Sequence, residues 1–368
     1  MSFLLNLTVF LSAASPSFED PALRAAVDRA LSNSKSTLET LVALDASGQG
    51  IRSLAGIEKL VSLRRVNLSK NAIQDVSPLG GLHRLEQILV DNNRIRTLAP
   101  LKGLSNLRVF SGFSNQIGSL EPVRGWRKIV GITLADNRIK DLGPLRELPT
   151  LRALWVPDNQ IRNVSALAGL TELKVLVLGN NPIQDVSPVR GLIAMVDLGL
   201  FGIELGSVDV LSQMTGLKRL NVRGCGIEDL SALAELRALE WVDVRDNEID
   251  DVSALAGHSR MSRLFASGNR ISDPRPLERL SALEWLVLDS NRIRAIGGLR
   301  DLQALKAISL TNNQIGLDNW PETAIALAAL EKRVVQVHFA PQEPPSVYGD
   351  VPGSAKGPDV DVEILRGQ

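Results

Sequence analysis

The chain repeats one pattern of apolar and polar positions every 22 residues, without an insertion, along most of its length. Steps of 22 from Leu44 to Ile308 meet an apolar residue at each of thirteen positions. Seven places after each of these positions lies an isoleucine, except in one unit, where Leu205 replaces it. A fixed period of this length predicts a solenoid, in which each turn of the coil contacts only its neighbours and the stacked turns bury one continuous core.

The unit from Val66 to Gln87 shows how the pattern translates into structure. Val66 and Leu68 alternate with polar residues, which predicts a short strand whose side chains point to opposite faces. Asp75 then precedes a Val-Ser-Pro-Leu turn, where its carboxylate is placed to cap one turn of 3₁₀ helix. Because 22 residues leave no room for a long helix as well, the outer side should consist of short 3₁₀ or irregular segments.

The motif L-x-x-L-x-L-x-x-N-x-I recurs in these units, and Ile129 to Ile139 is one copy of it. It is the motif of the leucine-rich repeat. The 22-residue form with Asp-Val-Ser-Pro-Leu on its outer side resembles the repeat of bacterial internalins and of eukaryotic phosphatase regulators. Residues 18–31, followed by residues 44–60, also resemble the internalin amino-terminal cap and first repeat.

This resemblance covers about residues 18–317. It implies an α/β solenoid: a right-handed leucine-rich-repeat horseshoe with a parallel β-sheet on its concave face, short 3₁₀ segments on its convex face and a helical N-terminal cap. No immunoglobulin-like module or wall-sorting signal is recognisable after the repeats. The host-cell invasion of named internalins is therefore not carried over.

Distinct segments flank the repeats. Asp20 is placed to cap a helix that begins at Pro21, and a second short helix is expected between Ser32 and Leu41. We predict a candidate signal peptide at 1–15, a helical N-terminal cap at 16–41, leucine-rich repeats with about thirteen strands at 42–317, a C-terminal helix-strand cap at 318–339 and a flexible tail rich in proline and glycine at 340–368.

The predicted location depends on the first fifteen residues. Phe3 to Leu11 is mostly apolar and small residues follow, as in a short secretory signal, but no basic residue precedes Arg24. The alternative is an amino terminus that the mature protein retains. We predict an extracytoplasmic bacterial protein, secreted or in the cell envelope, and a cytoplasmic one if residues 1–15 are not a signal.

Asparagine occupies ten of the thirteen positions that lie five places after the central residue of each strand. A buried carboxamide both donates and accepts hydrogen bonds, so it can bridge adjacent turns of the coil. The resemblance makes Cys225 an accepted substitute at this position, whereas Ile203 cannot bridge, so either a neighbour compensates there or the coil bends. The predicted structural ladder consists of Asn71, Asn93, Asn115, Asn137, Asn159, Asn181, Cys225, Asn247, Asn269, Asn291 and Asn313.

Aromatic residues gather at the positions expected on the concave face. Six of the fourteen Phe, Trp and Tyr residues occupy its 39 positions, where even scatter predicts about 1.5. Aromatic and arginine residues dominate binding hot spots, and an apolar patch rimmed by charge marks a recognition surface. The alternative is ordinary strand packing, since aromatic residues favour strands and rings on neighbouring strands can pack together. The predicted partner-binding residues are Phe113, Trp155, Phe201, Arg219, Arg223, Trp241, Asp243, Arg245, Phe265 and Trp285.

Composition and motif content argue against several classes of function. Lysine and arginine balance aspartate and glutamate at 41 each, which argues against broad phosphate binding and against nucleic acid, while leaving room for a local charged patch. No metal-ligand spacing or phosphate-cradling glycine loop occurs, and none of the three histidines pairs with a nucleophile by repeat geometry. One cysteine excludes an intrachain disulfide framework, and no apolar run approaches the roughly 20 residues that span a bilayer.

These features together predict a non-catalytic protein-binding module that recognises a protein partner on its concave face. We expect no enzyme activity, no cofactor, no metal, no transmembrane segment and a monomer. Two alternatives stay open. A cell-envelope glycan-binding protein would use the same aromatic rings beside Asp and Arg, and a cytosolic phosphatase-type regulatory scaffold would require residues 1–15 to be retained.

Overall fold

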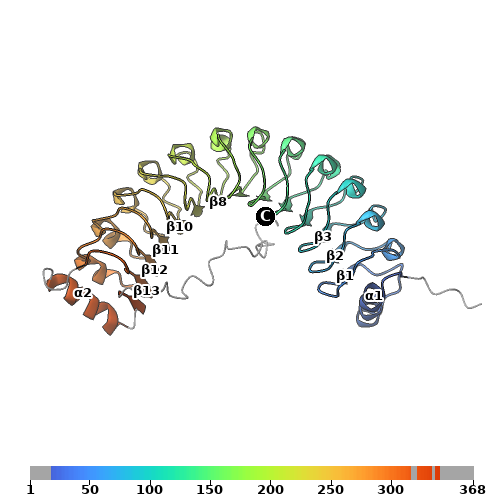
Figure 1. Ribbon diagram of the computed structural model, residues 1–368, viewed down its shortest axis with the longest axis horizontal. Helices are drawn as coiled ribbons and strands as arrows, with labels where there is room; N and C mark the ends of the chain where they lie inside the picture. Colours follow the sequence, from blue (N-terminus) through green and yellow to red (C-terminus); the bar gives the residue numbers. More distant parts are fainter. Residues whose placement is uncertain (1–17, 316–320, 334–335, 340–368) are drawn as a thin grey trace, which may run out of the picture.

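The computed structural model of the chain describes residues 18–315, 321–333 and 336–339. The candidate signal peptide at 1–15 and the predicted tail at 340–368 lie outside the described residues. Fourteen parallel strands form one sheet in chain order. The sheet lines the inside of an arc, and the 3₁₀ segments lie along its outside (Figure 1). The predicted horseshoe solenoid is therefore confirmed.

Each turn of the coil contributes one three-residue strand and, in most turns, one short 3₁₀ segment. The strands are β1 (Ala43–Asp45), β2 (Arg65–Asn67), β3 (Gln87–Leu89), β4 (Val109–Ser111), β5 (Gly131–Thr133), β6 (Ala153–Trp155), β7 (Val175–Val177), β8 (Asp197–Gly199), β9 (Arg219–Asn221), β10 (Trp241–Asp243), β11 (Arg263–Phe265), β12 (Trp285–Val287), β13 (Ala307–Ser309) and β14 (Gln336–His338). The 3₁₀ segments are η1 (Ile57–Lys59), η2 (Ser77–Leu79), η3 (Ala99–Leu101), η4 (Glu121–Gly125), η5 (Gly143–Glu147), η6 (Ser165–Leu167), η7 (Ser187–Gly191), η8 (Asp209–Leu211), η9 (Ser231–Leu233), η10 (Ser253–Leu255), η11 (Arg275–Arg279) and η12 (Gly297–Asp301).

The register of the sheet stacks equivalent residues directly on one another. Leu44 pairs with Val66, and Val242 pairs with Leu264, 22 residues further along. All thirteen apolar residues at the 22-residue step are buried. Since a fully buried aliphatic side chain contributes about 1.5–3 kcal/mol, stability is spread evenly over the repeats rather than concentrated in one centre.

The outer segments begin as their sequence predicts. In η2, the backbone N–H of Ser77 donates to Asp75 Oδ1 at 2.8 Å. The carboxylates of Asp141, Asp185 and Asp251 make the equivalent bond in their own repeats. Each carboxylate thus caps a short 3₁₀ segment, which takes the place of the long helix for which a 22-residue unit has no room.

The helix α1 (Pro21–Ser34) covers the amino-terminal end of the core. Asp20 Oδ1 accepts from the N–H of Ala22 at 2.9 Å, and Oδ2 accepts from the N–H of Arg52 at 2.7 Å, so one carboxylate caps the helix and ties it to the first repeat. The second short helix expected after Ser32 is wrong. Lys35 takes the left-handed conformation and ends α1, and only turns follow before β1.

The other end of the sheet is closed by α2 (Pro321–Lys332) and β14. α2 packs against η12, with Ala326 and Leu330 buried (Figure 1). β14 pairs in parallel with β13 and continues the sheet by one strand. Both elements keep the last repeat from exposing its core to water.

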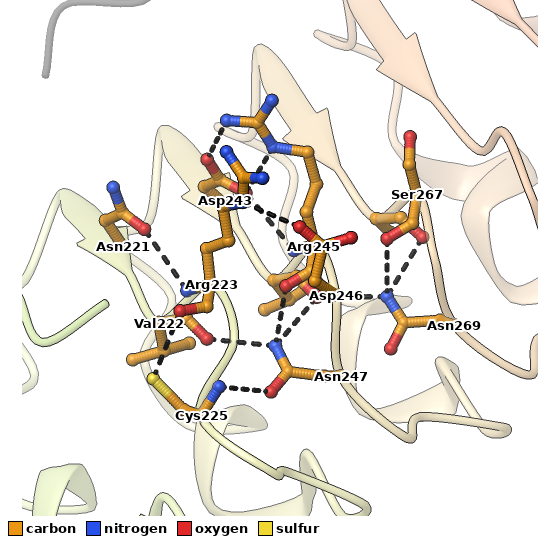
Figure 2. A network of polar contacts seen from close by, with 12 residues as sticks. Asn221, Val222, Arg223, Cys225, Asp243, Arg245, Asp246, Asn247, Ser267 and Asn269 are labelled. Atoms are coloured by element: carbon orange, nitrogen blue, oxygen red, sulfur yellow. Dashed lines mark hydrogen bonds and ion pairs between the residues drawn. The ribbon is translucent and has the colours of Figure 1, made fainter. Parts of the chain in front are cut away.

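The ladder asparagines each bridge two turns of the coil. Asn159 Nδ2 donates to the carbonyl oxygens of Leu134 (2.9 Å), Val156 (3.2 Å) and Pro157 (3.0 Å), and its Oδ1 accepts from the N–H of Ile139 at 2.9 Å. The nine other asparagines make the same set of bonds in their own repeats. Figure 2 shows Asn247 Nδ2 beside the carbonyl oxygens to which it donates, and its Oδ1 accepting a further bond from the N–H of Cys225 at 3.0 Å.

Cys225 takes the same place with a partial set of bonds. Its Sγ donates to the carbonyl oxygens of Leu200 (3.3 Å) and Arg223 (3.4 Å) (Figure 2 includes the second). The N–H of Leu205 in the preceding turn donates to the Cys225 backbone oxygen rather than to the side chain, at 3.0 Å. Burial raises the pKa of the Cys225 thiol to about 12, so the nucleophilic thiolate is scarce at neutral pH.

Ile203 leaves a gap in the ladder that the backbone fills. The N–H of Ile183, which an asparagine at 203 would bind, donates to the carbonyl oxygen of Asn181 at 2.8 Å. The N–H of Ile203 donates to Leu200 O at 3.2 Å. Backbone carbonyl oxygens therefore satisfy the N–H groups around the missing carboxamide.

Two polar rings replace the leucine that most repeats place at one buried position on the outer side. Trp126 Nε1 donates to Leu101 O at 2.9 Å. The ring of His258 is fully buried between two carbonyl oxygens, with Nδ1 3.1 Å from Leu255 O and Nε2 3.1 Å from Leu233 O. A neutral imidazole has one N–H, so it donates to only one of these carbonyls at a time.

Acidification should destabilise the protein through His258. Burial lowers the pKa of His258 below its ordinary value of 6.5, although the carbonyl oxygens oppose the shift. Below pH 6.5 the unfolded chain takes up a proton that the folded chain does not, so stability is full above this pH and declines as the pH falls. We expect the free energy of unfolding to fall more steeply from pH 7 to pH 5 than in His258→Leu, by at most about 1.4 kcal/mol per pH unit. Urea titrations across this range measure it, and equal slopes would contradict it.

Candidate functional site on the concave face

Alternation along each short strand decides which side chains reach the concave face. In β10, Val242 belongs to the core, whereas Trp241 on one side of it joins a separate cluster outside the core. The first and third residues of each strand, and the residue two places further on, therefore form the concave surface. Because the register never shifts, these side chains make three rows that cross all the repeats.

The ten predicted partner-binding residues differ in their exposure. Arg219 and Arg223 are exposed, and Phe113, Trp155, Phe201 and Trp285 are half-buried. Trp241 is only 9% exposed and Phe265 only 5%, and with Val287 they form a buried cluster apart from the main core. The expectation of outward-facing, accessible rings is therefore wrong for Trp241 and Phe265.

Lateral packing between strands explains this burial. The rings of Trp241 and Phe265 lie 5.7 Å apart between centroids, on adjacent strands. The guanidinium of Arg245 lies 5.5 Å from the centroid of the Phe265 ring, and that of Arg263 lies 6.0 Å from the Trp285 ring. Each ring thus has a neighbour in an adjacent repeat packed against it, as the strand-packing alternative describes. Arg263 was not among the predicted site residues.

The charged members of the site bind one another. Asp243 is fully buried and accepts from Arg245 at Nε (2.9 Å), Nη2 (2.5 Å) and the backbone N–H (3.1 Å). The more exposed Arg223 pairs with Asp246 at 2.7 Å (Figure 2). Asp243 was predicted to contribute to the charge that a partner meets. Instead it is buried and binds Arg245, whose guanidinium lies over the Phe265 ring.

Arg219 likewise has a partner within the protein. Its Nε lies 2.8 Å from Asp197 Oδ2. Burial raises the pKa of Asp197, and the nearby Arg219 opposes this shift. Half of the Arg219 side chain remains open to solvent, so the pair still presents a cation on the concave surface.

An uncharged sector occupies the middle of the concave face, over β4 to β7. Its twelve positions hold Val109, Ser111, Phe113, Gly131, Thr133, Ala135, Ala153, Trp155, Pro157, Val175, Val177 and Gly179. Trp155 lies between Thr133 and Val177 of the adjacent strands and is surrounded mostly by small side chains. Its indole is therefore less covered than that of Trp241.

Gly179 and Asp91 contact the aromatic residues at the two ends of this sector, Phe201 and Phe113. Phe201 lies over the backbone of Gly179, where a Cβ would come within 2.5 Å of the ring, so any larger residue would displace it. The N–H of Phe113 donates to Asp91 Oδ1 at 3.0 Å, and Ser111 Oγ donates to the same oxygen at 2.5 Å. Burial raises the pKa of Asp91, and these hydrogen bonds oppose the shift. Sequence reasoning missed both positions, although each lies on a concave row.

In the described part of the chain, no group of three or more His, Cys, Asp or Glu residues is arranged to hold a metal ion. Among the helices of that part, none is long and apolar enough to cross a membrane.

The repeated strand, ladder asparagine and 3₁₀ turn define a leucine-rich-repeat solenoid, and the chain is similar to internalins. The family model for leucine-rich repeats in two copies matches residues 61–103 and 149–191. An internalin (inlF) of Listeria monocytogenes superposes with a TM-score of 0.80 and 27% sequence identity, covering 90% of this chain and 99% of the internalin. No curated protein sequence matches the chain.

More distant structures share the fold alone. A leucine-rich-repeat protein of Leptospira interrogans has a TM-score of 0.64 and 18% identity, covering 85% of this chain and 98% of that one. The ectodomain of the Arabidopsis thaliana receptor kinase GASSHO1/SCHENGEN3 has a TM-score of 0.63 and 20% identity, covering 82% of this chain and 40% of that one.

Proposed function

We propose that the protein is a non-catalytic binding module that holds a protein partner along its concave face. The single observation that carries this proposal is the half-buried pair of rings, Trp155 and Phe201, on an open sheet face outside the core. Aromatic side chains in such positions lose their remaining contact with water when a partner covers them, which makes them frequent hot spots.

The two sectors of the face would serve different purposes. Trp155 and Phe201 would supply apolar contact, and Trp285 would extend it beyond the buried cluster. Arg219 and Arg223, which keep part of their surface exposed, would orient charged groups of the partner. Trp241, Phe265, Asp243 and Arg245 would shape the surface from below rather than contact the partner directly.

One fold relative is consistent with this proposal. The Arabidopsis ectodomain described above was determined in complex with CASPARIAN STRIP INTEGRITY FACTOR 2. A location outside the cytoplasm would suit such a module, and we propose it on the strength of residues 1–15.

Removal of Trp155 should test the site once a partner has been captured and identified by mass spectrometry. We expect Trp155→Ala to weaken binding by about 30-fold or more, the effect of a hot-spot side chain, with little change in the urea midpoint. Val61→Ala, an exposed apolar residue away from the concave rows, is the control and should leave binding unchanged. Unchanged affinity in both Trp155→Ala and Phe201→Ala would reject the proposed site, and retention only on a glycan array would favour the sugar-binding alternative.

A further inference from the structure

The residue immediately before each of the strands β2 to β13 lies at the edge of the sheet where the strands begin. The backbones of these residues are joined in register, since Arg152 N donates to Val130 O at 2.9 Å and Lys174 N donates to Arg152 O at 2.9 Å. Equivalent side chains of successive repeats are therefore neighbours. We call this set the flank row: Arg64, Glu86, Arg108, Val130, Arg152, Lys174, Val196, Lys218, Glu240, Ser262, Glu284 and Lys306.

Most charged residues of the flank row form ion pairs with a residue of opposite charge in the same row. Arg64 binds Glu86 at 2.7 Å, and Lys218 binds Glu240 at 3.2 Å. Glu284 and Lys306 make a third pair at 2.9 Å. In each case the partners come from consecutive repeats, so the row normally neutralises itself by alternating sign.

The stretch from Arg108 to Lys174 breaks this rule. Among the described residues, Arg108, Arg152 and Lys174 have no ion-pair partner, and Arg152 and Lys174 are direct neighbours of like charge. Val130 occupies the place where a carboxylate would pair with both arginines. Glu172, two residues before Lys174 in the sequence, forms no ion pair among the described residues. Like charges on neighbouring strands destabilise a sheet edge, and local conflicts of this kind are expected where a surface serves a function.

Apolar surface continues the row beyond its basic stretch. Val196 follows Lys174 and is half-buried, and Ile193 of the same repeat is 62% exposed. Two further cations lie beside the row, Arg127 and Lys128, the latter bonded to Asn106 Oδ1 at 2.8 Å. No row position carries an aromatic side chain on which a nucleotide base could stack. The mixture of cations and aliphatic side chains fits a polypeptide better than a phosphate polymer.

We propose that the flank row from Arg108 to Val196 binds an acidic polypeptide segment that carries aliphatic residues beside its carboxylates. Guanidinium and ammonium groups would bind the carboxylates, and Val130, Val196 and Ile193 would contact the aliphatic side chains. This surface lies at the edge of the sheet and uses none of the concave residues, so it is independent of the proposed concave site.

The test uses the full chain and a synthetic twelve-residue peptide of alternating Glu and Leu. A peptide with Gln in place of Glu and a single-stranded thymidine oligonucleotide of equal length are the comparison probes. The test variant is the triple Arg108→Gln, Arg152→Gln, Lys174→Gln. The matched control is Arg94→Gln, Arg138→Gln, Arg162→Gln, which removes three exposed cations from the opposite edge of the strands, where no ion pair engages them within the described residues.

At low salt we expect the Glu peptide to bind at least tenfold more tightly than the Gln peptide or the oligonucleotide, and added salt to weaken it. The test triple should reduce this affinity at least tenfold, whereas the control triple and Trp155→Ala should leave it within twofold. Equal losses in both triples, no loss in the test triple, or tighter binding of the oligonucleotide would each overturn the proposal. Circular dichroism of both triples checks that they remain folded.

Discussion

Replacement of Asn159 by alanine is expected to lower the free energy of unfolding by about 2–4 kcal/mol, because it opens the ladder at a central repeat. The N–H of Ile139 loses the oxygen to which it donates, and the carbonyl oxygens of Leu134, Val156 and Pro157 each lose one bond. Two of these oxygens keep a second ladder partner, since Asn137 still binds Leu134 O and Asn181 still binds Val156 O. The orphaned N–H is therefore the main cost, and the lost volume of a buried side chain adds to it.

A surface asparagine four residues away gives the matched control. Asn163 Oδ1 accepts from the N–H of Ser165 at 2.8 Å and lies exposed at the start of η6. Asn163→Ala removes the same side chain from a cap, where the cost should be about 0.5–1 kcal/mol. Urea unfolding followed by circular dichroism and by indole fluorescence measures both. Similar costs for the two variants would show that the ladder bonds contribute little.

The same variant also reports on how the repeats cooperate. Because each turn is held only by its neighbours, a weak turn at Asn159 should let the two flanking halves unfold separately. Asn159→Cys should lie between wild type and Asn159→Ala. Cys225 shows that a thiol still donates to carbonyl oxygens, whereas the N–H of Leu205 in the preceding turn bonds the backbone oxygen of Cys225 instead of its side chain.

The repeat architecture was predictable because each of its causes recurs in every turn. The apolar residue at the 22-residue step occurs thirteen times, the isoleucine seven places on twelve times and the ladder asparagine ten times, and each has the same structural role wherever it recurs. A single exception such as Ile203 therefore does not obscure the pattern, and the backbone bond of Ile183 absorbs it. The second amino-terminal helix failed because it occurs once, and local propensity alone did not reveal that Lys35 ends α1 in a left-handed conformation.

The exposure of the concave side chains was not predictable in the same way. Alternation assigns Trp241, Phe265 and Trp155 to the same face of the sheet. It does not predict how much of each side chain its neighbours cover. That depends on neighbours in the adjacent repeats: an arginine covers the Phe265 ring, whereas small side chains surround Trp155. The 22-residue period relates equivalent residues to one another, whereas the cover of each ring comes from unlike residues in adjacent rows of the concave face.

Replacement of Arg245 by alanine should lower the free energy of unfolding by about 3–5 kcal/mol, because it leaves the fully buried Asp243 carboxylate without its counter-charge. Arg245 also covers the Phe265 ring, so its loss opens the buried cluster to water. Arg223→Ala is the matched control. Its pair with Asp246 has about half of each side chain exposed, and such pairs contribute at most about 1 kcal/mol.

A second substitution separates the stranded charge from the lost packing. In the Arg245→Ala background, Asp243→Asn removes the buried charge and should restore part of the lost stability, although Asp243→Asn alone destabilises the wild type. Thermal and urea unfolding of the four proteins in this cycle give the coupling energy between the two side chains. Equal costs for Arg245→Ala and Arg223→Ala would show that the buried carboxylate does not depend on Arg245, and no recovery in the double variant would show that the stranded charge contributes nothing to the loss. Partial recovery would assign the recovered part of the cost to the stranded carboxylate and the remainder to the loss of Arg245 from the Phe265 ring.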